Sequence, residues 1–111
     1  MRAAGCEILH PIGGLAVTGL LDVPRILPRL RRLRRELVEG VRREGPQAVV
    51  LVDYPGFNLS LAKALRKLPG GPRLIYFIPP QVWAWGAGRA RTIARTFDLA
   101  LTIYPFEPAY F

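Results

Sequence analysis

The pattern of apolar and polar residues changes several times along this chain of 111 residues. From Arg25 to Arg43, apolar side chains recur every three or four positions, and arginines fill most positions between them. This spacing predicts an amphipathic helix with one apolar stripe, and Gly45-Pro46 predicts its end. The stripe consists of Ile26, Leu27, Leu30, Leu33, Leu37, Val38 and Val41.

Three short apolar runs follow this helix, and each is typical of a strand that is buried on both faces of a parallel sheet. A helix with Asn58 as its N-cap is predicted between the first two runs, and Pro69-Gly70-Gly71-Pro72 predicts its end. A basic helix over Gly86–Phe97 is predicted between the second run and the third. The runs are Ala48–Asp53, Arg73–Ile78 and Asp98–Tyr104.

Strands that alternate with helices predict an α/β fold with βαβαβ order and a parallel sheet. Ligands of such sheets bind beyond the carboxyl ends of the strands, where Asp53 and the loop PPQVWAW are expected. Asp53 is there either a general base or an acid that caps the turn after it. Asn58 is an N-cap that can also face a ligand. Gln81 can form hydrogen bonds, and Trp83 and Trp85 can stack on sugar or base rings or cover a sheet edge.

The net charge favours anionic partners. Lys and Arg number 16 against 8 acids, which gives a formal charge of +8. Apolar residues directly upstream of the basic helix are typical of a membrane-surface contact. The alternatives are a solvated charged face and nucleic acid, which is not expected because no aromatic residues are interleaved with the arginines. The expected membrane-contact residues are Leu15, Val17, Leu20, Leu21, Arg31 and Arg32.

The remaining signals exclude some classes of protein. No apolar run approaches the roughly 18–20 residues of a membrane span, and no signal peptide is evident. The single cysteine, Cys6, cannot form an internal disulfide and is predicted to be a small buried thiol. His10 has no companion ligands, so no metal site is expected. No cofactor is expected either.

The motifs VDYPGFN, QVWAW and YPFE occur here in order, after GCE, LAVTGLLDV and RLRRLRREL. In this combination the chain resembles the lipid-A-disaccharide synthases over nearly all of its length. The resemblance implies an inverting, metal-independent glycosyltransferase of the GT-B type. It would transfer diacylglucosamine from UDP-2,3-diacylglucosamine to 2,3-diacylglucosamine 1-phosphate (lipid X) and release UDP. It also implies a peripheral protein on the cytoplasmic face of the inner membrane of Gram-negative bacteria.

In that family the aspartate of the motif seen here as VDYPGFN is essential, which makes Asp53 the expected catalytic residue. The tryptophan loop would lie by the cleft, and Leu15, Val17, Leu20 and Leu21 would touch lipid. Residues 1–111 are expected to form part of the acceptor-side, N-terminal Rossmann-like domain, in three layers. They lack the family's first strand with its glycine-rich loop, and the C-terminal domain that holds UDP-sugar. The chain alone is therefore expected to be an inactive fragment. The alternative is a non-catalytic, basic membrane- or lipid-binding module.

Overall fold

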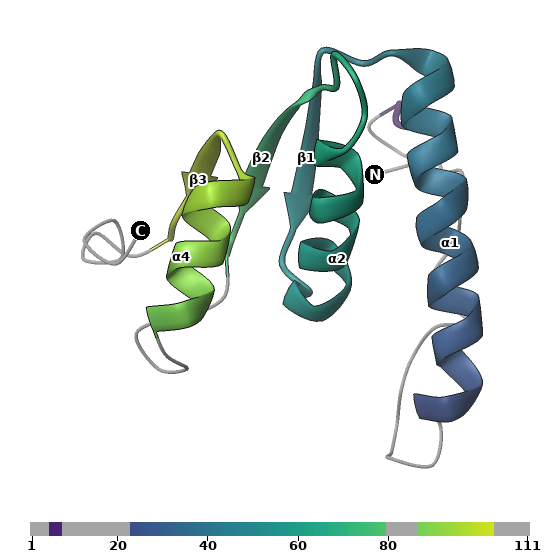
Figure 1. Ribbon diagram of the computed structural model, residues 1–111, viewed down its shortest axis with the longest axis horizontal. Helices are drawn as coiled ribbons and strands as arrows, with labels where there is room; N and C mark the ends of the chain where they lie inside the picture. Colours follow the sequence, from purple (N-terminus) through teal and green to yellow (C-terminus); the bar gives the residue numbers. More distant parts are fainter. Residues whose placement is uncertain (1–4, 8–22, 80–86, 104–111) are drawn as a thin grey trace. The chain divides into compact units, whose positions relative to one another are not determined.

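The computed structural model describes residues 5–7, 23–79 and 87–103 (Figure 1). The chain divides into two compact units, Met1–Leu33 and Arg34–Phe111. Helix α1 begins in the first unit and ends in the second, and within the first unit its residue Ile26 is buried. The described elements are α1 (Val23–Glu44), β1 (Ala48–Val52), α2 (Pro55–Arg66), β2 (Arg73–Phe77), α4 (Ala87–Thr96) and β3 (Leu99–Leu101).

The three strands form a parallel sheet in the order β1-β2-β3, which confirms the predicted α/β fold and its βαβαβ order. Val52 pairs with Phe77, and Phe77 pairs with Leu101, so the carboxyl ends of all three strands lie at one edge. A residue that follows β1 therefore lies beside a residue that follows β2. This register brings the sequence-predicted site residue Asp53 next to Ile78.

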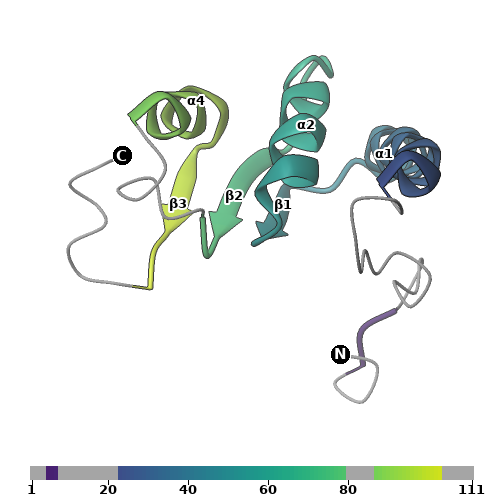
Figure 2. The same cartoon turned by 90° about the horizontal axis from the view of Figure 1, so that it is seen from below.

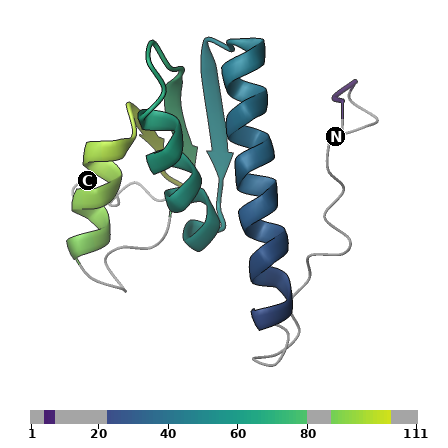
Figure 3. The same cartoon turned by 45° about the vertical axis from the view of Figure 1, so that its right-hand side comes forward.

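Helices α2 and α4 lie side by side on one face of the sheet (Figures 2 and 3). The core fills the space between these helices and the sheet, and the C-terminal half of α1 packs against it through Leu37, Val38 and Val41. Tyr76, Leu65, Leu74 and Ile93 are its largest fully buried side chains. The core cluster consists of Leu51, Leu61, Ala62, Leu65, Leu74, Tyr76, Ala90, Ile93 and Phe97.

The opposite face of the sheet is apolar and exposed, so the prediction of strands buried on both faces is wrong for this face. Val50 and Val52 are 54% and 52% exposed, and Phe77, Leu99 and Leu101 are exposed beside them. Consecutive parallel strands joined by crossovers of one hand place both connecting helices on the same side. Within the described ranges the fold thus has two layers, and the expected third layer is absent from them.

One boundary agrees with the sequence prediction, and two differ from it. Helix α1 ends as predicted, because Gly45 adopts φ +61° and its N–H donates to the carbonyl of Val41 at 2.9 Å. Helix α2 begins at Pro55 rather than after Asn58. Strand β3 ends at Leu101, short of the predicted Tyr104.

Cys6 is exposed, so the prediction of a buried thiol is wrong. The core cluster is built from residues between 51 and 97 and does not include it.

An ion pair fixes the amino edge of the sheet. Asp98 Oδ2 accepts a hydrogen bond from the N–H of Leu74 at 2.8 Å and forms a salt bridge with Arg66 Nη2 at 2.9 Å. These two interactions, the backbone hydrogen bond first, lower the pKa of Asp98. The contacts join the end of α2 to the starts of β2 and β3, and they lie at the edge opposite Asp53.

Candidate functional site

Asp53 is the first residue after β1, and its side chain is exposed at the carboxyl edge of the sheet. Its N–H donates to the carbonyl of Phe77 at 3.0 Å, which extends the β1–β2 ladder by one bond. Its carbonyl oxygen accepts two further bonds, from Asn58 Nδ2 at 2.6 Å and from Tyr76 Oη at 3.1 Å. The backbone of Asp53 is thus fixed by three hydrogen bonds while its side chain is exposed.

The backbone at this edge adopts a costly conformation. Asp53, Tyr54 and Ile78 have φ values of 49°, 43° and 57°, in the left-handed region that side chains with a Cβ disfavour. Each such residue costs about 1–3 kcal/mol and persists only when surrounding contacts hold it. The bonds to Asp53 hold the first turn, and Ile78 N–H donates to the carbonyl of Leu101 at 3.0 Å. Strained residues of this kind gather at functional sites.

Asn58 is not an N-cap, which corrects the sequence prediction. Pro55 starts α2 because its fixed φ suits the first helical position, and the N-cap residue Tyr54 makes no side-chain capping bond. Asn58 lies in the first turn and is only 7% exposed. Its Nδ2 donates to the carbonyl oxygens of Val52 at 3.0 Å and Asp53 at 2.6 Å. Asn58 therefore ties α2 to the end of β1 and holds the turn that carries Asp53.

Tyr76 is a site residue that the sequence reading missed. Its ring is buried and stacks on Phe97, with 4.7 Å between centroids and 26° between planes. Burial, and then the negative charge of Asp53, raise the pKa of Tyr76 to about 12, while the nearby cation Arg89 opposes this. The hydroxyl therefore stays protonated and donates to Asp53. A tyrosine inside a buried strand needs such a partner, which is the signal that could have identified it.

Positive electrostatic potential surrounds the same edge. Helices α2 and α4 each follow a strand end, so their N-termini begin there, and a helix N-terminus carries partial positive charge. Arg89 lies in the first turn of α4, and its positive charge acts to lower the pKa of Tyr76. The edge thus combines an exposed carboxylate with groups that favour an anion.

Several predicted site residues fall outside the described ranges. Gln81, Trp83 and Trp85 lie outside them. The first residue of their loop, Pro79, is described and follows Ile78 at the carboxyl edge that also carries Asp53. Among the expected membrane contacts, Arg31 and Arg32 are exposed on α1, whereas Leu15, Val17, Leu20 and Leu21 also fall outside those ranges.

Two further properties concern metals and membranes. In the described part of the chain, no three His, Cys, Asp or Glu side chains gather closely enough to hold a metal ion. None of the helices in that part combines the length and the apolar character needed to cross a bilayer.

Known proteins with similar sequences identify the family of this chain. The profile of the family described as lipid-A-disaccharide synthetase matches residues 1–111. The chain is similar to proteins named lipid-A-disaccharide synthase. It is 43% identical over 111 residues to the one from Alkalilimnicola ehrlichii. The matched region is 100% of this chain and 28% of the relative. For Syntrophotalea carbinolica the identity is 45% over 112 residues, 97% of this chain and 27% of the relative.

A third relative, from Chromohalobacter salexigens, is 40% identical over 111 residues, 100% of this chain and 28% of the relative. The chain therefore spans a little over a quarter of the length of these proteins. The profile and the identities extend over essentially all of its residues. On this evidence the chain belongs to the lipid-A-disaccharide synthase family.

Proposed function

We propose that this chain forms part of a glycosyltransferase that makes the lipid A disaccharide. The complete protein would transfer diacylglucosamine from UDP-2,3-diacylglucosamine to the sugar hydroxyl of lipid X and release UDP. Family membership supports this assignment, because the relatives are named for that product. The substrates are anionic, and the positive helix N-termini and Arg89 at the carboxyl edge are suited to them.

Asp53 would act as the general base. As the sugar hydroxyl attacks the anomeric carbon, the new C–O bond forms, the bond to UDP breaks, and the Asp53 carboxylate accepts the hydroxyl proton. The observation that carries this role is the fixed Asp53 backbone beside an exposed side chain. A base must be held within hydrogen-bonding reach of the proton that it accepts, and the bonds from Asn58 and Tyr76 are suited to that task. Gln81, Trp83 and Trp85 are proposed substrate-binding residues of the adjoining loop.

The domain assignment is part of the same proposal. Residues 1–111 would belong to an N-terminal, acceptor-side Rossmann-like domain, and a second domain of the complete protein would hold UDP-sugar. The open apolar face around Val50, Val52 and Phe77 supports this, because parallel sheets occur almost only with both faces covered. Chain beyond these residues, in the complete protein, would supply the missing layer.

Membrane contact would bring the diacylated substrates within reach. Arg31 and Arg32 are exposed on α1 and can meet an anionic surface. The apolar residues Leu15, Val17, Leu20 and Leu21 would dip into the lipid beside them. The complete protein would then be a peripheral protein on the cytoplasmic face of the inner membrane. A lipid-binding module without catalysis remains the second candidate, and the basic surface of α1 favours it.

Turnover of a complete relative tests the role of Asp53. In a complete relative that carries an aspartate at the position of Asp53, changing this residue to Asn keeps the size of the side chain but removes the base. The expected loss in kcat is about 10²–10⁴-fold. The matched control, in a relative that also carries an aspartate at the position of Asp98, is the same change there, at the opposite edge, which should leave kcat nearly unchanged. Equal kcat in the folded Asp53-type variant and the wild type would refute the assignment.

A further inference from the structure

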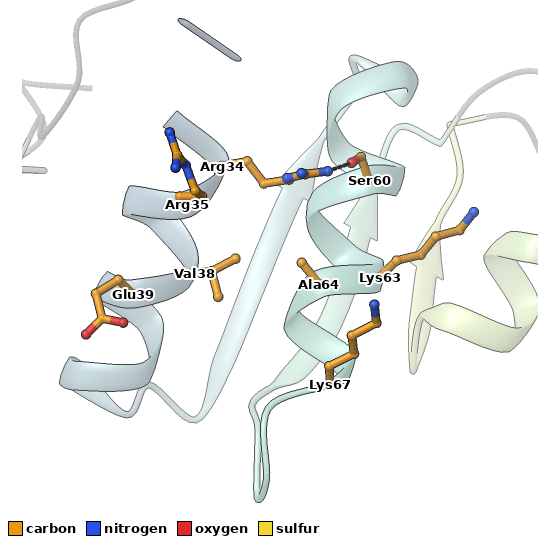
Figure 4. A pocket seen from close by; sticks show the side chains of 8 residues that line it. All are labelled: Arg34, Arg35, Val38, Glu39, Ser60, Lys63, Ala64 and Lys67. Carbon is orange, nitrogen blue, oxygen red and sulfur yellow. Dashed lines mark hydrogen bonds between the residues drawn. The ribbon is translucent and has the colours of Figure 1, made fainter. Parts of the chain in front are cut away.

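A basic groove lies between the C-terminal half of α1 and the outer side of α2 (Figure 4). It has a volume of about 650 Å³. Val38 and Ala64 form its apolar part, and Arg34 extends from α1 to Ser60 on α2, where its Nη1 donates to the hydroxyl oxygen. The other lining residues are Arg35, Glu39, Lys63 and Lys67.

The charges of the groove are almost all of one sign. Four cations line it, two from α1 and two from α2 with its C-cap residue Lys67, and both lysines of the chain are among them. Glu39 is its one acid, and Arg42 already engages that carboxylate through Nε at 3.0 Å and through Nη2. In Figure 4 the Glu39 carboxylate points away from α2. No acid in the described part of the chain forms a salt bridge with Arg35, Lys63 or Lys67.

Cations gathered in this way repel one another, and the repulsion falls when a multiply charged anion binds between them. The apolar lining strengthens the attraction, because charges beside low-dielectric walls are less screened. Ser60 Oγ accepts from Arg34, so its own hydrogen is available for an oxyanion. Guanidinium and ammonium groups with a hydroxyl are common ligands of phosphate.

We propose that the groove formed by Arg34, Arg35, Ser60, Lys63 and Lys67 binds a phosphate monoester dianion. Arg34 and Ser60 form the fixed part of the site, since they are partly buried and bonded to each other. Arg35, Lys63 and Lys67 are exposed. The Lys63 ammonium points away from α1 in Figure 4, so its flexible stem would have to turn toward the groove to contact the ligand. The phosphate belongs either to a soluble ligand or to a lipid headgroup. This inference goes beyond glycosyl transfer and requires no role for Asp53.

Binding without turnover tests the proposal on the full 111-residue chain. The soluble arm titrates the chain with phenyl phosphate, followed by calorimetry or by NMR shifts at fixed ionic strength. The lipid arm measures co-sedimentation with phosphatidylcholine vesicles that contain phosphatidic acid. The groove variant is Arg35→Gln with Lys67→Gln, one exposed cation from each side. The control is Arg91→Gln with Arg95→Gln, two exposed cations on α4 that lose the same charge.

The groove variant should bind about tenfold more weakly in at least one arm, while the control stays within about twofold of wild type. Loss in the phenyl phosphate arm identifies a soluble ligand, and loss in the vesicle arm alone identifies a lipid headgroup. Circular dichroism confirms that each variant is folded. Equal weakening by the groove and control pairs would overturn the proposal, because net charge alone would then explain binding. Absence of binding in both arms would also overturn it, and neither result bears on Asp53.

Discussion

Asn58→Asp is the substitution that most directly tests how the site is held. The two side chains have nearly the same shape, so the core packing around position 58 is retained. Asn58 Nδ2 donates to the carbonyl oxygens of Val52 and Asp53, at 3.0 Å and 2.6 Å. A carboxylate can donate to neither, and it would face both carbonyl oxygens with like partial charge.

The expected cost follows from these contacts. Two lost hydrogen bonds contribute about 2 kcal/mol together. Placing a charge at a position only 7% exposed adds at least about 1–2 kcal/mol more. We therefore expect the free energy of unfolding at pH 7 to fall by about 3–4 kcal/mol. That is a large part of the total stability of a domain of this size.

Urea unfolding followed by circular dichroism measures this loss, with Lys63→Asp on the exposed side of α2 as control. The carboxyl group introduced at position 58 has a raised pKa in the folded state, because its charged form is disfavoured there. The cost should therefore be smaller at pH values well below about 4, where the carboxyl group is protonated in both states and can still donate one hydrogen bond. It should grow as pH rises above the unfolded-state pKa of about 4 and should level off above the folded-state pKa. A cost at pH 7 no larger than that of Lys63→Asp, or one independent of pH, would refute the reasoning.

Three other predictions concern Tyr76, Asp98 and the arginines of α1. Tyr76→Phe keeps the ring stack but loses the bond to Asp53, so the free energy of unfolding should fall by about 1 kcal/mol; an unchanged urea midpoint would contradict this. Asp98 has a lowered pKa, so its stabilisation is present above about pH 4 and is lost below it. The stability gap between wild type and Asp98→Asn should therefore close on acidification. Arg31→Gln with Arg32→Gln should reduce co-sedimentation with phosphatidylglycerol vesicles at low salt. Equal co-sedimentation with neutral vesicles would argue against an electrostatic contact.

Periodicity predicted the order of the elements correctly, because each element is marked by a local pattern. The arginine-flanked stripe gave α1, and the three apolar runs gave the three strands. Their crossovers required a parallel sheet, and the observed register places Asp53 at the carboxyl edge as expected. These features depend only on residues that are close in sequence and on the handedness of the connections.

Burial of the sheet could not be read from the same runs. A strand such as Ala48–Val52 is apolar on both faces, and nothing in its sequence says which face its own helices will cover. The order β1-β2-β3 puts α2 and α4 on one side and leaves Val50 and Val52 exposed on the other. The start of α2 was missed for a related reason. Pro55 and Asn58 both favour a helix start, and the tertiary bonds of Asn58 decide between them.

Tyr76 shows why the core and the site of this fold are not separate. Its ring joins β2 to the core by stacking on Phe97, and its hydroxyl reaches the backbone that carries Asp53. The strained turn at Asp53 and Tyr54 is unfavourable in isolation. It is held by one bond from the core and by two from Asn58 at the start of α2. A change that loosens α2 or β2 should therefore displace Asp53 without touching it. The precision of this edge depends on the packing beneath it.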